Sequence, residues 1–192
     1  MWHIFWRDAN FHEALVQKDI ELGEECRLLG CPRCGGVLHR ANYPRLSCGM
    51  VLPRWRSCYE VRISFCCASC RRRITPKSVR FFGRRWYAGW TVLLVSMLER
   101  GPSHRRCEKL RRLGFAVSES TWQQWRGWWR HRFERTRFWA SIRGFWVGIG
   151  PSPRWPRPLL AKRHCTALSM RQLLHLLGPL TVPFALCLRA VN

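Results

Sequence analysis

Two stretches of the chain decide its fold, Cys31-Pro32-Arg33-Cys34-Gly35-Gly36 and Cys67-Ala68-Ser69-Cys70-Arg71-Arg72-Arg73. Each contains a C-x-x-C turn, which brings two thiolates to one metal ion from a tight loop. The pairs are about thirty residues apart with a strand-like run between them, which is the arrangement of a zinc ribbon. We therefore predict one structural Zn²⁺ ion, with four ligands: Cys31, Cys34, Cys67 and Cys70.

Other potential ligands lie close by in the sequence, so an exchange of one ligand stays open at this point. They are Cys48, Cys58, Cys66 and His39. A different reading makes the paired thiols buried apolar residues of a core without metal. A redox C-x-x-C is disfavoured, because there are two pairs and neither lies between a strand and a helix of a βαβ unit.

The charge of the chain indicates a polyanionic partner. Its 192 residues include 34 lysines and arginines but only 11 acids, a formal net charge of +23. Such a field attracts nucleic acid or an anionic membrane surface and argues against a small cationic substrate. A GC-rich genome, which favours arginine codons, would account for part of the magnitude. The 47% hydrophobic content is enough for a real core.

The compartment is predicted from two features. The N-terminus lacks the pattern of a secretory signal, and the longest apolar run, 86–98, falls short of the roughly 20 residues that cross a bilayer. We therefore expect a cytoplasmic protein with no membrane association. In that compartment the 11 cysteines indicate metal binding and free thiols rather than disulfides.

The predicted fold class is α+β, with four successive parts. They are an N-terminal extension (1–25), a zinc ribbon (26–80), a helix-turn-helix domain (81–147), and a Pro/Gly linker with a leucine-rich, partly irregular tail (148–192). Residues 11–25 predict a short helix or strand. In 59–65, apolar residues alternate with polar ones, the period of a half-buried strand.

Helical periodicity begins at Trp86, and Gly101-Pro102 ends the first helix. A second helix is predicted over 103–113 and a third from Ser118 or Ser120 toward Trp139, with Ser120 and Gln123 as a capping box. The short turn at 114–117 between them gives the layout of a helix-turn-helix. A plain helical bundle has similar periods, so that alternative stays open.

The candidate nucleic-acid contacts come from two segments. No acid lies between Glu60 and Glu99, where eight arginines and lysines, Arg62 and Arg80 among them, form a predicted basic face. On the third helix, tryptophans lie toward the core and leave a polar face opposite. The predicted contacts are Arg71, Arg72, Arg73, Lys77, Arg84, Ser120, Gln123, Gln124, Arg126, Arg130 and His131. We expect the ribbon arginines to lie next to this helix; the alternative is a solvated basic surface.

The cysteine motifs carry a resemblance, together with the run Thr75-Pro76-Lys77-Ser78-Val79-Arg80-Phe81-Phe82-Gly83-Arg84. Over roughly residues 28–140 the chain resembles short, mostly uncharacterised bacterial proteins associated with insertion sequences, which combine a zinc ribbon with a helix-turn-helix. The resemblance implies DNA binding by analogy and identifies no catalytic residue.

The charge, the motifs and the resemblance are compatible with three functions of the protein. The favoured one is a DNA-binding accessory or regulatory protein of a bacterial mobile element. An RNA-binding ribbon would use Phe81, Phe82 and Trp86 as a stacking platform. A transposase-type nuclease needs two or three carboxylates around magnesium ions, and the acids after Glu25 are scattered, so we do not expect an enzyme. The leucines of 168–177 would bind a transposase or a second copy, or dock on the chain's own core.

Overall fold

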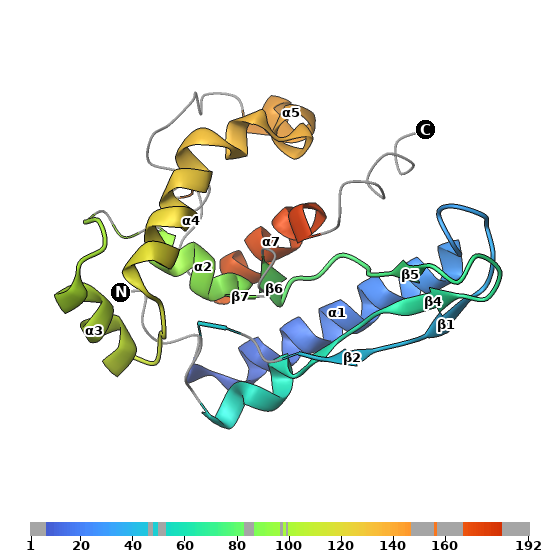
Figure 1. Cartoon of the computed structure of the whole chain (residues 1–192), viewed down its shortest axis with the longest axis horizontal. Helices are drawn as coiled ribbons and strands as arrows, with labels where there is room; N and C mark the ends of the chain where they lie inside the picture. The colour runs from blue at the N-terminus through green and yellow to red at the C-terminus, as the bar shows by residue number, and fades with distance from the viewer. Residues whose placement is uncertain are drawn as a thin grey trace.

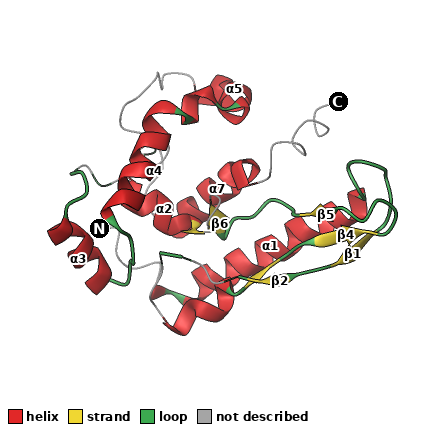
Figure 2. Ribbon diagram, viewed as in Figure 1, coloured by secondary structure: helices red, strands yellow, loops and turns green. Residues whose placement is uncertain are grey.

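The structure is a computed structural model that describes residues 7–45, 48–49, 53–82, 87–96, 98, 100–146, 156 and 167–181. Helices and small antiparallel sheets occur together, which confirms the α+β class (Figure 1). Most of the short strands lie along one long helix, α1 (Ala9–Leu29), whereas the last hairpin and the other helices collect toward one end of the molecule (Figure 2). None of the helices in the described ranges is long and apolar enough to cross a membrane.

Helix α1 (Ala9–Leu29) resolves the choice between helix and strand for the acid-rich segment. It begins where the side chain of Asp8 accepts a hydrogen bond from the backbone N–H of Asn10, and it ends at Gly30, whose φ of 74° breaks the helical backbone. The helix continues past residue 25, the predicted end of the N-terminal extension. It therefore leads directly into the first cysteine pair.

A three-stranded sheet forms the body of the ribbon. Strands β1 (Leu38–Arg40), β4 (Phe65–Cys67) and β5 (Arg73–Ile74) pair antiparallel in the order β1-β4-β5. In the register Leu38 faces Cys67, and Phe65 faces Ile74. These four side chains and Cys31 form a small buried core of their own, separate from the main core.

The alternation expected over 59–65 is only partly present. Tyr59 and Phe65 are buried as predicted, but Val61 is 45% exposed and Arg62 is completely buried. Arg62 is drawn inward because its guanidinium donates a 2.6 Å hydrogen bond to the carbonyl of Pro76 and lies over the Phe81 ring. Residues 53–59 form a 3₁₀ helix, η2 (Pro53–Tyr59), before β3 (Val61–Arg62) pairs with β2 (Tyr43–Pro44).

After the hairpin of β6 (Phe81–Phe82) and β7 (Tyr87–Ala88), the chain is helical. Helices α2 (Gly89–Ser96), α3 (His104–Arg112) and α4 (Glu119–His131) confirm the three predicted helical segments. The third is shorter than expected, because η3 (Phe133–Arg135) separates it from α5 (Arg137–Ile142), which runs into η4 (Arg143–Trp146). Its N-cap is Ser118, which accepts from the N–H of Thr121, so the predicted capping box at Ser120 is wrong.

The main core is built around tryptophan. Trp90 of α2 and Trp122 and Trp129 of α4 are completely buried, and Phe133 joins them. Helix α7 (Ala167–Leu177), followed by η5 (Gly178–Thr181), packs against α1 and α2 and places Leu173, Leu174 and Leu177 in this core. The leucine-rich segment thus docks on the chain's own core, one of its two predicted roles.

Candidate metal centre and basic surfaces

The two cysteine pairs sit in loops of the same construction. In the first, Cys31 donates its N–H to the carbonyl of Gly36 (2.9 Å) and accepts from the N–H of Gly35 (2.8 Å). In the second, Cys67 donates to Arg72 (2.9 Å) and accepts from Arg71 (3.0 Å). The hydrogen bonds therefore join the same relative positions in both loops. Each loop turns its two thiols toward the same point between them.

Each loop is closed by a residue in the left-handed backbone conformation. Gly35 has a φ of 71°, and the matching position of the second loop is Arg71, with a φ of 56°. Glycine adopts this conformation at no steric cost, whereas a residue with a Cβ atom is strained there. Gly36 is needed for a different reason: a Cβ atom there would lie 2.6 Å from Ser69 Oγ and 3.0 Å from Cys67 Sγ.

The four predicted thiols converge. The Sγ atoms of Cys31, Cys34, Cys67 and Cys70 all lie within 4.8 Å of one another. Across the loops, Cys31 Sγ is 3.7 Å from Cys70 Sγ, and Cys34 Sγ is 3.5 Å from Cys67 Sγ. A zinc–sulfur bond of about 2.3 Å in a tetrahedron separates the sulfurs by about 3.8 Å. The four residues therefore fit a tetrahedral metal ion.

The electrostatics of the cluster favour a bound cation. The backbone N–H of Cys70 lowers the pKa of Cys67 to about 6, and the N–H of Arg33 lowers that of Cys31. For Cys34, the N–H of Gly36 acts in the same direction, but the neighbouring Cys67 sulfur and burial raise its pKa to about 11. The four sulfurs cannot all be thiolates without a positive charge among them, and a divalent cation supplies it.

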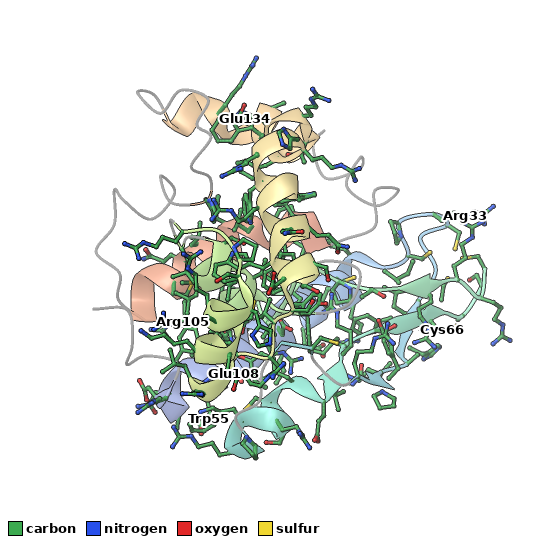
Figure 3. All side chains as sticks on the ribbon, turned by 60° about the vertical axis from the view of Figure 1, so that its left-hand side comes forward. Arg33, Trp55, Cys66, Arg105, Glu108 and Glu134 are labelled. Atoms are coloured by element: carbon green, nitrogen blue, oxygen red, sulfur yellow. The ribbon has the colours of Figure 1, made fainter. Side chains whose placement is uncertain are left out.

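The alternative ligands lie elsewhere. Successive residues of β4 alternate between faces, so Cys66 points away from Cys67, and its Sγ lies 3.6 Å from the carbonyl oxygen of Arg71. His39 is paired with Cys66 in the register and shares that outer face. Figure 3 labels Cys66 on the ribbon. Cys58 lines a groove beside α1, and the backbone of Cys48 forms an isolated parallel β-bridge with that of Tyr87. Among the described cysteines, the converging set is the predicted one.

The predicted basic face is smaller than the sequence suggested. Arg62 and Arg80 are buried, and Arg80 Nε donates to Asp19. Neither guanidinium can therefore contact a nucleic acid. Arg71, Arg72, Arg73 and Lys77 are exposed, whereas Arg84 lies outside the described residues. Arg73 also braces the sheet, because its guanidinium donates to the carbonyl of Ala41 and lies over the Tyr43 ring.

The stacking platform considered for RNA is not exposed. Phe81 is 1% and Phe82 is 9% accessible, because both strands of that hairpin pack into the main core. Phe82 stacks on Trp129 and meets Trp128 edge-on. The third member, Trp86, lies outside the described residues. The two phenylalanines therefore serve packing rather than base stacking.

Helix α4 has the two faces that its sequence predicts, with one exception. Trp122 and Trp129 are completely buried, whereas the polar residues opposite are exposed: Ser120, Gln123, Gln124, Arg130 and His131. The exception is Arg126, which is half-buried and donates a 2.7 Å hydrogen bond to the carbonyl of Leu98. That contact fastens α4 to the segment after α2. A complete polar strip remains free of the core.

The ribbon arginines do not lie next to α4, so that prediction is wrong. Figure 1 places the cysteine loops at one end of the longest axis and α3 and α4 toward the other end. Helix α1 spans the distance between them, and α4 packs instead against α2. Sequence order suggested proximity, but the strands that carry Cys67 and Arg73 extend along α1 away from the helical end.

The sequence reasoning missed the basic character of α3. Its nine residues hold Arg105, Arg106, Lys109, Arg111 and Arg112, with Glu108 as the single acid. All five cations are exposed, and within α3 only Cys107 is buried. The signal was present in the sequence as a run of cations at 105–112.

Comparison with known proteins adds no relative to this picture: no protein-family model, curated protein or solved structure matches the chain.

Proposed function

We propose that the protein binds duplex DNA through α4 and uses the four cysteines to hold a structural Zn²⁺ ion. The observation that carries the proposal is the division of α4 into two faces. One face is sealed into the tryptophan core, whereas Ser120, Gln123 and Gln124 are exposed at its N-terminal half. A recognition helix in the major groove reads bases with its N-terminal residues in this way.

The surroundings of α4 support this assignment. Helix α3 precedes it, and the turn between them starts at Gly114, with a φ of 97°, and buries Phe115 and Val117. Phe115 packs edge-on against Trp90 of α2, so one core joins the three helices. In a helix-turn-helix the first helix crosses the phosphate backbone while the second enters the groove. The exposed cations of α3 suit the first role and the glutamines of α4 the second.

The zinc ion is assigned to folding. Four cysteine ligands leave no open coordination position for a water or a substrate, so the metal takes no part in chemistry. When bound, it supplies the cross-link that holds the two loops of the ribbon together. The resemblance to insertion-sequence proteins supports the role of an accessory or regulatory protein of a bacterial mobile element, with binding rather than catalysis as its activity.

The test is a competition assay at fixed salt among duplex DNA, single-stranded DNA and structured RNA. Duplex DNA is expected to compete best. In a selection from random duplexes, Gln124→Ala should change the preferred sequence, because glutamine pairs bidentately with adenine. Arg105→Ala, on α3, should weaken every sequence alike and reduce the salt slope by about one.

Lys18→Ala is the matched control, because it removes one positive charge that is paired with Glu21 on α1. It should change neither preference nor affinity. Preferential binding of structured RNA would favour the alternative of an RNA-binding ribbon. Equal effects of Gln124→Ala and Arg105→Ala on all sequences would remove α4 from base reading. Magnesium-dependent strand cleavage by the purified protein would replace the binding role with a nuclease.

A further inference from the structure

Helix α4 contains one glycine, Gly127, that the fold of the chain does not require. Glycine inside an exposed helix lowers stability relative to alanine, because its backbone loses more freedom on folding. In α1, packing accounts for the glycine at position 23, where a Cβ atom would lie 3.0 Å from Ile63 Cγ2. A Cβ atom at Gly127 would have nothing of the described structure within 4 Å, apart from the neighbouring backbone of α4 itself. An alanine would therefore fit there and would make α4 more stable.

Gly127 lies in the middle of the polar face of α4. Four residues at intervals of four, three and four share this side of the helix: Ser120, Gln124, Gly127 and His131. The opposite side is sealed in the tryptophan core. The side chains of Gln124 and His131 are exposed and form no hydrogen bond or ion pair with other described residues. The missing side chain therefore lies between polar groups that are free to contact a partner.

The dimensions of the groove give this missing side chain a role. A helix with its side chains is about 10–12 Å across, and the major groove is about 12 Å wide. A helix that lies along the groove has almost no spare room, so the lack of a Cβ atom on its inner side lets the backbone approach the bases closely. A helix that entered only by its N-terminal turn would leave Gly127 and His131 outside the groove.

We propose that α4 lies lengthwise in the major groove and that Gly127 marks the closest approach of its backbone to the DNA. The inference rests on the proposed function and deepens it, because it adds the orientation of the helix and a contact in its third turn. From Ser120 to His131 the polar face is about 16 Å long, which corresponds to about five base pairs of duplex. In Figure 3, α4 runs from beside α3, where Arg105 is labelled, to the turn at Glu134, so the cations of α3 would contact phosphates beside the same stretch of groove.

The experiment adds side chains of increasing size at this position in the full-length protein. Gly127→Ala and Gly127→Leu are compared with the wild type, and Gly144→Ala in η4 is the control, because a Cβ atom there also meets nothing within 4 Å. The probe is the duplex that the wild-type protein enriches most strongly from a pool of random duplexes. Fluorescence anisotropy gives its affinity for each protein, thermal unfolding gives the stability of each protein, and missing-base interference maps the contacted base pairs.

Gly127→Ala is expected to raise the midpoint of thermal unfolding by about 2–4 °C and yet to weaken duplex binding by about 10-fold. Gly127→Leu should weaken binding further, Gly144→Ala should leave it unchanged, and the contacts of the wild type should cover about five adjacent base pairs.

Three results would overturn the lengthwise docking while the proposed function stands. They are an unaltered affinity in both Gly127 variants while Gln124→Ala still changes the preferred sequence, an equal loss of affinity in Gly144→Ala, and a lower unfolding midpoint in Gly127→Ala. Absence of any duplex binding by the wild-type protein would instead overturn the proposed function, and this inference with it.

Discussion

Asp19 and Arg80 form a buried ion pair between segments 61 residues apart. Arg80 Nε donates to Asp19 Oδ2 at 2.8 Å, and the exposed fraction is 5% for the Arg80 side chain and 0% for that of Asp19. Asp19 also accepts from Ser78 Oγ and from the N–H of Val79, both at 2.7 Å. The remaining guanidinium nitrogens of Arg80 donate to backbone carbonyls. The pair therefore fastens α1 to the segment that joins the ribbon to the helical end.

Asp19→Asn should be strongly destabilising. The substitution leaves the Arg80 charge buried without its counter-charge, and breaking one partner of a buried pair costs about 3–5 kcal/mol. Chemical denaturation measures the free energy of unfolding. Glu21→Gln, on the same helix, breaks the exposed pair with Lys18 and should cost less than about 1 kcal/mol. Equal losses in the two variants would contradict the structural role of Asp19.

The metal site predicts a sharp difference between two adjacent cysteines. Cys67→Ala should abolish zinc binding, because three thiols leave the tetrahedron incomplete, whereas Cys66→Ala should retain one Zn²⁺ per chain. Elemental analysis of the purified proteins gives the stoichiometry. Loss of zinc in Cys66→Ala with retention in Cys67→Ala would reverse the ligand assignment.

Chelation should loosen the ribbon more than the tryptophan core. The ribbon has a small core of its own, whereas Trp90, Trp122 and Trp129 belong to the larger cluster. Hydrogen exchange after zinc removal should therefore rise in β1, β4 and β5 while the amides of α2 and α4 stay protected. Uniform deprotection of both regions would show that the metal holds the whole chain together.

In the two cysteine loops, a substitution to glycine and a substitution away from glycine should have opposite effects. Arg71→Gly should stabilise the protein by about 0.5–1 kcal/mol, because the φ of 56° suits glycine. Gly36→Ala should lower zinc affinity, since its Cβ atom would crowd Cys67 Sγ. Thermal unfolding and competition with a zinc chelator measure the two effects. Arg72→Gly, without a left-handed backbone, is the control and should not stabilise.

Tyr59 should make the stability of the protein depend on pH in the alkaline range. Burial raises the pKa of its hydroxyl, which accepts a hydrogen bond from Trp90 Nε1 at 2.9 Å. Above about pH 10 the unfolded state releases this proton and the folded state keeps it, so stability falls as pH rises, by up to about 1.4 kcal/mol per pH unit. Tyr59→Phe should be less stable at neutral pH but lack this component of the slope. An unchanged slope would exclude Tyr59 as its source.

The sequence was sufficient for features that depend on neighbours along the chain. The spacing of Cys31, Cys34, Cys67 and Cys70 identified the converging thiols, because a C-x-x-C loop has little choice of geometry. Periodicity predicted the two helices that occur at 104–112 and 119–131, although it extended the second one toward Trp139, and it identified the buried side of Trp122 and Trp129. Each of these inferences rests on a repeat that the backbone imposes locally.

Only the tertiary structure decided which charges face solvent and how far apart the basic surfaces lie. Arg62 and Arg80 are indistinguishable in sequence from Arg72, yet both are buried, because their partners, Pro76 and Asp19, are brought to them by the fold. Likewise, α1 separates the cysteine loops from α3 and α4 (Figure 1). The sequence by itself determined which four cysteines converge into a cluster that could hold a metal ion, and which faces of the helices are buried. Burial and distance required long-range packing, because they depend on residues that are remote in the chain.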